Sequence, residues 1–359
     1  MAATRTLSRY FLREAAGAWV AVLAVLVLVM LASRSVRFLT AAAEGKIPVD
    51  LVLRVVLLSA LQYVTLITPI SLLLGVMLAM GRMYKDQEIT AATACGVSLG
   101  RLARPFAVLA LIAAFGTAVL SLDLGPRAGR AVDRLTLEAR EQLSYAPFES
   151  GRFASLAGGD AVFYAERASD GGTVFETVFI RSELPEFPGV ILAGGGRQRV
   201  LPGEATREIA LSDGHAYRRL DGALAWDRMT FDELELRLEP PELLYTPSEA
   251  EIEPTRALLA RGDTAALAEF HWRLASPIAV LLMVLIAVPL SHVGPRQGRY
   301  SKLVLGLIIY IVYANLLGAG QTALERGSIP VWLGLWPVHA GALGVGIWLC
   351  ARRVGRPKA

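Results

Sequence analysis

The chain has 359 residues, of which 54% are hydrophobic, and its formal net charge is +4. A soluble globular protein is usually about 45–50% apolar, so the excess favours a membrane protein. The surplus of Lys and Arg lies in short flanks beside apolar stretches, and no nucleic-acid role is needed to explain it.

Long charge-free apolar stretches are the main feature of the sequence. Each is close to or above the roughly 20 residues that a helix needs to cross a bilayer core. The first follows several arginines as a signal peptide would, but it exceeds the 7–15 residues of a signal core, so we expect an uncleaved span. The stretches predict six transmembrane helices: Ala15–Ala32, Val55–Gly81, Pro105–Leu122, Leu274–Pro295, Leu303–Leu324 and Gly327–Ala351.

Basic residues on alternate sides of these stretches set the expected orientation. Segments on the cytoplasmic side of a membrane carry an excess of Lys and Arg. With both termini cytoplasmic, every inner segment is basic and the large polar segment between the third and fourth spans lies outside. The inner basic residues are Arg5, Arg9, Arg13, Arg82, Lys85, Arg101, Arg104, Arg296, Arg299, Lys302, Arg352, Arg353, Arg356 and Lys358.

The polar segment Asp123–Arg273 alternates in the manner of β-strands after a helical start at Gly125–Glu141. Asp170-Gly171-Gly172 and Asp213-Gly214 are typical of turns, and we interpret Gly194-Gly195-Gly196 as a flexible turn as well. Short strands at this spacing predict an antiparallel sandwich or jelly roll. Both cysteines, Cys95 and Cys350, lie elsewhere in the chain, so this domain must fold without disulfides.

The expected fold class is therefore a membrane α-helical protein, three spans plus three, with an inserted all-β domain. Residues 1–122 hold the first three spans and a cytoplasmic helix at about 84–98. Residues 123–270 form the outer β domain with helical and Pro-rich connectors, including Pro240–Pro254. Residues 271–359 hold the last three spans and a basic tail.

Motifs for catalysis are absent from the sequence. It has no P-loop, no H-E-x-x-H and no C-x-x-C, and its four histidines lie far apart, so we expect no catalytic residues, metal or cofactor. No Asp or Glu lies within an expected span, which argues against a carrier driven by an ion gradient. If the chain moves a substrate, the energy comes from a partner.

The inner loop Arg82–Arg104 contains Asp86 and Glu88 before an Ala-rich run that ends at Gly96. Acids near the start, Ala inside and Gly at the end predict a short helix. Two interpretations are open. The helix is a structural connector, or it is a coupling helix that fits a groove in a cytoplasmic motor, with Asp86 and Glu88 as contact residues.

Arg34 and Arg37 lie three residues apart at the outer end of the first span, against the positive-inside trend. They are either anchors at the headgroup level or a pair of cations for an anionic ligand at the outer leaflet. Arg suits phosphate because its planar group binds in a bidentate way. Lys46 and Arg54 could join them.

Three segments are similar to a known family. They are Arg9-Tyr10-Phe11-Leu12-Arg13-Glu14, then Glu88-Ile89-Thr90 with Ala94-Cys95-Gly96, and Val288-Pro289-Leu290-Ser291 with Pro295-Arg296-Gln297-Gly298-Arg299. In these segments and in its order of spans the chain resembles the LptF/LptG-type permeases of the lipopolysaccharide-export ABC transporter, and the last segment favours the LptF branch. The resemblance covers essentially the whole chain and is weakest in the outer domain.

This resemblance implies six spans in the bacterial inner membrane and a periplasmic β-jelly-roll. It implies an LptG-like permease, an LptB-like ATPase dimer and an LptC-like single-span protein as partners. Lipopolysaccharide would enter between the two permeases from the outer leaflet and leave toward a periplasmic bridge. Arg34 and Arg37 fall on the family's lipid-phosphate site, and Glu88 on its coupling-helix acid. The rival hypotheses are an ion-coupled lipid carrier and a membrane-anchored scaffold or sensor.

Overall fold

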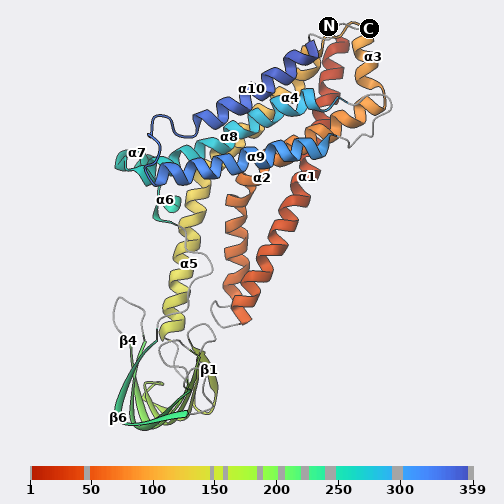
Figure 1. Ribbon diagram of the computed structural model, residues 1–359. Coiled ribbons are helices and arrows are strands. Elements are labelled where there is room, and N and C mark those ends of the chain that lie inside the picture. The colour runs from red at the N-terminus through yellow and green to blue at the C-terminus, as the bar shows by residue number, and fades with distance from the viewer. Residues whose placement is uncertain are drawn as a thin grey trace. The chain divides into compact units, whose positions relative to one another are not determined.

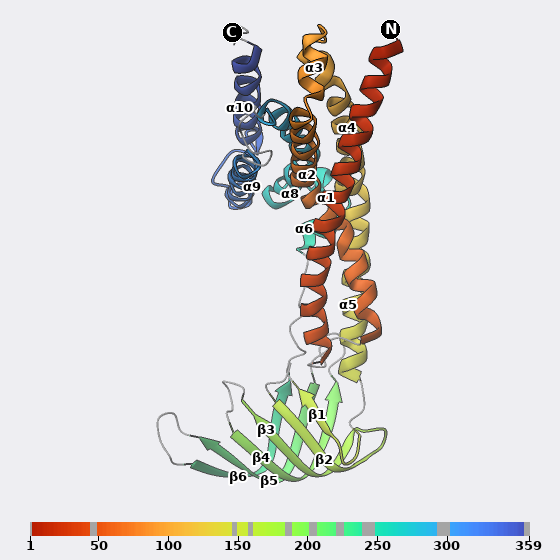
Figure 2. The same ribbon diagram turned by 90° about the vertical axis from the view of Figure 1, so that its right-hand side faces the viewer.

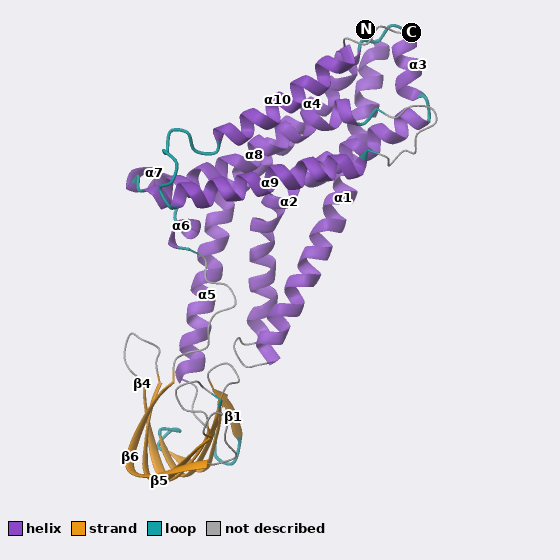
Figure 3. Cartoon of the chain, in the orientation of Figure 1, coloured by secondary structure: helices purple, strands orange, loops and turns teal. Residues whose placement is uncertain are grey.

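The computed structural model describes residues 2–43, 49–145, 149–156, 161–183, 189–200, 207–219, 226–238, 248–292 and 302–354 (Figure 1). The chain forms two compact units. The helical unit comprises Met1–Ser33, Leu57–Ala131 and Pro247–Ala359, and the second unit comprises Arg34–Val56 and Val132–Thr246. Helices and strands separate along the chain, and every strand lies in the segment between α5 and α6 (Figure 3).

Most helices follow the apolar stretches of the sequence. The helix predicted at Gly125–Glu141 is present as α5, which continues the third apolar helix through a short π-helix, η1. The helices are α1 (Ala2–Ala43), α2 (Val49–Lys85), α3 (Glu88–Ala94), α4 (Leu99–Val119), η1 (Leu120–Leu124), α5 (Gly125–Tyr145), α6 (Glu249–Ile252), α7 (Thr255–Arg261), α8 (Thr264–Leu290), α9 (Leu303–Glu325) and α10 (Trp336–Val354).

The core of the helical unit lies where α2, α4 and α8 meet. Leu72 of α2, Phe106 of α4 and Met283 of α8 are fully buried in it. Small residues allow the helix backbones to approach closely, as in other membrane bundles. At Gly75 of α2 a Cβ atom would lie 2.6 Å from Cα of Trp19 in α1, so only glycine fits this crossing.

Among the described residues, five helices are long and apolar enough to cross a membrane. They contain four of the first five expected spans, and α8 covers the fourth as far as Leu290. Helix α10 covers most of the expected sixth span but does not meet the same criterion. It begins only at Trp336 and includes His339, Arg352 and Arg353, which lower its mean hydropathy. The predicted count of six spans is therefore not confirmed.

The expected β insertion is a single six-stranded antiparallel sheet in the order β1-β2-β3-β4-β5-β6. One face carries the core: Phe163, Ile180, Ile191 and Ala216 lie in one row across four strands, and all four are buried. A jelly roll has two sheets, and the described strands do not confirm it. The strands are β1 (Phe153–Leu156), β2 (Ala161–Ser169), β3 (Val174–Ser182), β4 (Gly189–Val200), β5 (Arg207–Arg219) and β6 (Trp226–Leu238).

Two of the predicted turns are wrong, because the strands run through them. Gly194-Gly195-Gly196 lies inside β4, and Asp213-Gly214 lies inside β5. Thr177, Gly194 and Asp213 occupy one line across β3, β4 and β5 where the ladder pairing is interrupted, and Thr177 and Asp213 both have φ of +52°. Residues of left-handed conformation bend a strand as a bulge does, and the sheet is strongly curved (Figure 2). Asp170-Gly171-Gly172 is a turn as predicted, between β2 and β3.

We predict that the segment from Gly151 to Leu238 folds by itself as a β domain without disulfides. Its buried face supplies a core, and Phe175, 1% exposed, lies in it. Replacing a buried Phe by Ala costs about 3–5 kcal/mol, so Phe175→Ala should lower the thermal midpoint sharply. Phe153→Ala is the control, because Phe153 is 71% exposed. Far-ultraviolet circular dichroism of the parent segment and its two variants is the measurement. A helical or coil spectrum for the parent would contradict the prediction.

Candidate functional site

Helix α3 lies at the end of the helical unit where α1 begins and α10 ends (Figures 1 and 2). It falls inside the segment 84–98 for which the sequence predicts a short helix. Gln87, with φ of +61°, separates it from α2, and Gly96, with φ of +86°, follows its end. The amides of Gly96 and Val97 donate to the carbonyls of Thr93 and Ala92 at 3.0 and 3.1 Å, which is a Schellman motif. Both ends of α3 are therefore defined by backbone geometry.

Four side chains tie α3 to α1 and α2. The hydroxyl of Tyr10 donates to Oε1 of Glu88 at 3.0 Å, and Nη2 of Arg82 donates to the Tyr10 oxygen at 3.1 Å. The same Arg82 forms an ion pair with Glu14 at 3.1 Å. Tyr10 and Glu14 are four residues apart and so lie on one face of α1. The position of Glu88 thus depends on the first turns of α1 and the last turn of α2.

The two faces of α3 differ in character. Ile89 is 1% exposed and packs in the main core of the helical unit, which fixes the rotation of the helix. Thr90, Ala91 and Ala94 are small and exposed. Asp86 and the free thiol of Cys95 are exposed as well. Oε2 of Glu88 is out of contact with solvent and accepts no hydrogen bond from the described residues. Buried carboxylate oxygens are normally hydrogen-bonded, so this atom is an exception among the described residues.

Arg34 and Arg37 lie on α1, which continues without a break to Ala43. Arg34 shares a helix face with the buried Phe38 and is half-buried, whereas Arg37 is exposed. Arg54, near the start of α2, is exposed as well. Lys46 lies outside the described residues, as do Pro295–Arg299. The two arginines are one turn apart as predicted from their spacing, and their ligand stays a prediction.

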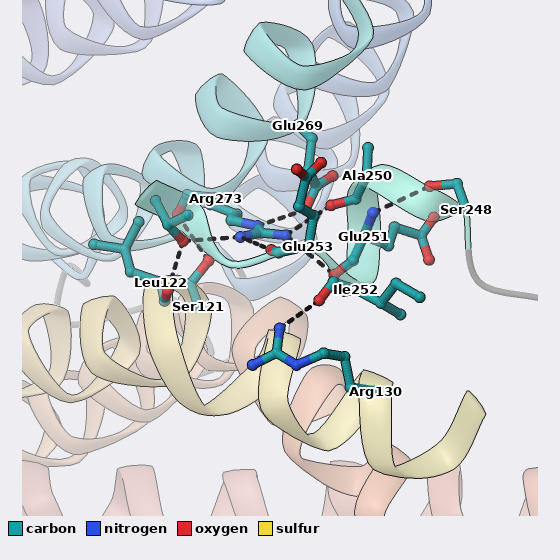
Figure 4. Close-up of polar contacts among 11 residues, drawn as sticks. Ser121, Leu122, Arg130, Ser248, Ala250, Glu251, Ile252, Glu253, Glu269 and Arg273 are labelled. Atoms are coloured by element: carbon teal, nitrogen blue, oxygen red, sulfur yellow. Dashed lines mark hydrogen bonds and ion pairs between the residues drawn. The ribbon is translucent and has the colours of Figure 1, made fainter. Parts of the chain in front are cut away.

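A polar cluster that the sequence did not reveal surrounds Arg273 of α8 (Figure 4). The Arg273 side chain is 3% exposed and pairs with Glu269 one turn earlier, at 2.8 Å. Its Nη1 donates to the Glu253 carbonyl at 3.0 Å and to Oγ1 of Thr255 at 2.8 Å. Its Nη2 donates to the carbonyls of Ala250 and Glu251 at 2.9 and 3.1 Å. All five N–H donors of the guanidinium are therefore used.

The same cluster reaches the π-helix η1. Oγ of Ser121 donates to the backbone carbonyl of Arg273 at 2.8 Å, and Oγ1 of Thr255 donates to the carbonyl of Leu122 at 2.6 Å. Arg130 of α5 donates to the carbonyl of Ile252 (Figure 4). A π turn breaks the regular ladder and so leaves carbonyls available for such bonds. The segment that precedes α8 is thus fixed to both η1 and α8.

Comparisons with known proteins show to which family the chain belongs. Residues 9–352 match the family described as lipopolysaccharide export system permease LptF/LptG. The chain belongs to the LptF/LptG family. It is 30% identical over 347 residues to the lipopolysaccharide export system permease protein LptF of Escherichia coli K12, which covers 95% of this chain and 93% of that protein. The LptF proteins of Escherichia coli O157:H7 and Shigella flexneri match to the same extent.

In this LptF/LptG family member an acid and a base lie in the helix that holds the fourth expected span, just before its apolar run. Helix α8, one of the five long apolar helices, begins at Thr264 and so includes Glu269 and Arg273. The sequence-based boundary at Leu274 excluded them because apolar residues become continuous only there. The available signal was the i, i+4 spacing of an acid and a base just before the run.

We predict that Arg273→Ala destabilises the helical unit of this LptF/LptG chain. The change leaves Glu269 buried without its cation, and breaking a buried pair in this way costs about 3–5 kcal/mol. Arg273→Lys should lower the free energy of unfolding by a smaller amount, because an ammonium keeps the charge but has three donors in place of five. Arg127→Ala is the control, since Arg127 pairs with Asp123 on an exposed surface. Unfolding by SDS in mixed micelles measures the effect, and equal midpoints for Arg273→Ala and the control would refute it.

Proposed function

We propose that the chain is the LptF-type permease subunit of an ABC exporter. It extracts lipopolysaccharide from the outer leaflet of the inner membrane and passes it to a periplasmic bridge. The chain is non-catalytic, and ATP is hydrolysed by a partner. Membership of the LptF/LptG family over residues 9–352 supports the substrate, and the relatives carry it in their names.

The observation that carries the proposal is the fixed position of α3. A coupling element must move together with the spans when a motor pushes it. The Tyr10–Glu88 hydrogen bond and the buried Ile89 join α3 to α1 and to the core of the helical unit. Its exposed face is made of small residues and suits a groove. The exposed Asp86 and the half-buried Glu88 are the residues that we assign to the ATPase.

The orientation follows from the basic flanks. Both termini and α3 are cytoplasmic in this proposal, and the β insertion is periplasmic. An LptB-like ATPase dimer then meets α3, an LptG-like permease completes the membrane cavity, and an LptC-like single-span protein joins on the periplasmic side. The absence of cysteine from the insertion means that its folding is independent of the redox state of that compartment.

Arg34 and Arg37 serve in this proposal as the site for the phosphorylated sugar head of lipopolysaccharide. They are at the end of α1 that faces the outer leaflet. The exposed Arg37 meets the lipid first, and the half-buried Arg34 lies on the same helix face as the buried Phe38. Two guanidinium groups one turn apart match a phosphate better than two flexible ammonium groups do.

The rival functions find less support. An ion-coupled carrier needs an acid that gains and loses a proton in the membrane. Glu269 is the acid buried in α8, but Arg273 holds it, and that arginine has all its donors in use. A scaffold or sensor would not need α3 to be tied to two spans. Co-purification separates the hypotheses, because an ATPase and a second permease should accompany only an exporter subunit.

We predict that Glu88→Ala weakens association with the ATPase. A charge-assisted hydrogen bond is worth about 1.5–3 kcal/mol, which corresponds to a loss of about 10- to 150-fold in affinity. Glu88→Gln should show a smaller loss, because its amide oxygen still accepts from Tyr10 while the charge is gone. Pull-down of the ATPase and transport by the reconstituted complex are the measurements. Normal association together with normal transport for Glu88→Ala would remove the coupling role.

We predict that changing both Arg34 and Arg37 to Glu abolishes capture of lipopolysaccharide, because like charges repel the phosphates. Changing both to Lys should keep part of the capture, since the charge survives without the planar geometry. Leu39→Glu is the control, as it adds an acid at the same end of α1 at an exposed position on a different helix face from the two arginines. Photocrosslinking of lipopolysaccharide to each variant in the assembled complex is the measurement. Normal capture by the double-Glu variant would leave both residues as membrane anchors.

A further inference from the structure

A groove of about 910 Å³ lies between the first turns of α1 and the beginning of α4, inside the helical unit. The rings of Phe11 and Phe106, 6.3 Å apart, join the two helices beside it. The groove is separate from the Tyr10–Glu88 hydrogen bond, which none of its lining residues makes. Its lining residues are Thr6, Leu7, Ser8, Arg9, Phe11, Leu12, Val97, Arg101, Leu102, Arg104, Pro105 and Val108.

The charged side chains in this groove all carry the same sign. Arg9, Arg101 and Arg104 line it, and no carboxylate does. Within the described part of the chain, none of the three forms an ion pair. The N-terminus of α4 adds its partial positive charge close by. Three unneutralised guanidinium groups around one cavity favour an anion, and their planar donors suit phosphate oxygens.

The rest of the groove is apolar and continues as an apolar surface. Arg101, Arg104 and Val108 follow one another at three- and four-residue spacing on a single face of α4. The same face goes on through Leu111 and Phe115, which are exposed in this chain. A ligand that extends from the arginines along this face therefore has a charged end and an apolar chain.

The position of the groove relative to the hydrocarbon core of the membrane agrees with such a ligand. Arg104 is directly followed by the charge-free run Pro105–Leu122, and on α1 the corresponding run Ala15–Ala32 begins shortly after Arg13. Each run is about 27 Å long at 1.5 Å per residue, which is close to the roughly 30 Å of a hydrocarbon core. The arginines of the groove are therefore at the level of the lipid headgroups.

We propose that this groove binds one acidic glycerophospholipid, with its phosphate on Arg9, Arg101 and Arg104 and an acyl chain along the exposed face of α4. Basic pockets between spans on the cytoplasmic side hold lipid headgroups in other membrane proteins. The proposal rests on the membrane orientation given above. The site is distinct from Arg34 and Arg37, because the apolar run of α1 separates them from Arg9.

A membrane lipid fits this groove better than an acidic protein segment. A peptide would need polar partners for its backbone, and the lining offers few besides the arginines. A protein bound at the headgroup level would also leave the apolar face of α4 at Leu111 and Phe115 uncovered. Both arguments point to a ligand that is itself part of the bilayer.

The test uses the purified full-length chain in a neutral detergent, without the ATPase. Native mass spectrometry measures the binding of added phosphatidylglycerol and of phosphatidylcholine to the parent, to Arg101→Gln/Arg104→Gln, and to the control Arg13→Gln/Lys85→Gln. The control removes the same charge at the same end of the helices but outside the groove. All four side chains are exposed, so both variants should fold, and their thermal midpoints are checked.

We expect the parent and the control to bind one phosphatidylglycerol at least tenfold more tightly than phosphatidylcholine, with affinity that falls as salt rises. The groove variant should lose this preference. Equal affinities of the groove variant and the parent would overturn the proposal, as would equal binding of both lipids by the parent. In a second measurement the ATPase is added to the parent with its bound phosphatidylglycerol, and displacement of the lipid there would assign the groove to a protein and overturn the proposal as well. Because neither export nor lipopolysaccharide enters the assay, its result is independent of the proposed function.

Discussion

The guanidinium of Arg273 is the interaction on which the arrangement of the helical unit depends. A cation buried among apolar helices is costly unless its charge is paired and its donors are satisfied. Glu269 supplies the charge, and the carbonyls of Ala250, Glu251 and Glu253 supply most of the remaining acceptors. These carbonyls belong to the segment that brings the chain back from the β insertion. One side chain therefore decides where that segment meets α8, and it satisfies backbone groups that short helices such as α6 leave unpaired.

The beginning of α1 serves two sites at once. Tyr10 and Glu14 lie on the face that contacts Arg82 and Glu88, whereas Arg9 and Leu12 lie on the face that lines the groove beside α4. A helix can do this because residues one apart point about 100° away from each other. A change of lipid in the groove and a push on α3 would therefore act on the same two turns of helix.

Local features of the chain were predictable, and long-range ones were not. The apolar helices, the α5 extension and the Gly96 cap depend on residues near one another in the sequence. Asp213-Gly214 was misread because Asp and Gly tolerate left-handed backbone, which serves a turn or a bend within a strand equally well. The bond between Tyr10 and Glu88 joins residues 78 positions apart. The partners of Arg273 are mostly backbone carbonyls, which every residue has and which leave no trace in the sequence.

The π-helix Leu120–Leu124 has a consequence for the angular register of the chain. A π turn holds one residue more than an α turn, and each residue advances a helix by about 100°. Because the π turn is wider, it takes up its extra residue without changing the direction in which the following helix faces. Loss of one residue between Leu120 and Leu124 would therefore restore a regular helix and leave Arg130 facing the Ile252 carbonyl, whereas loss of one residue from the regular turn before Arg130 would rotate it by about 100°. Single-residue deletions should accordingly be tolerated better within the π-helix than in the regular turns that follow it.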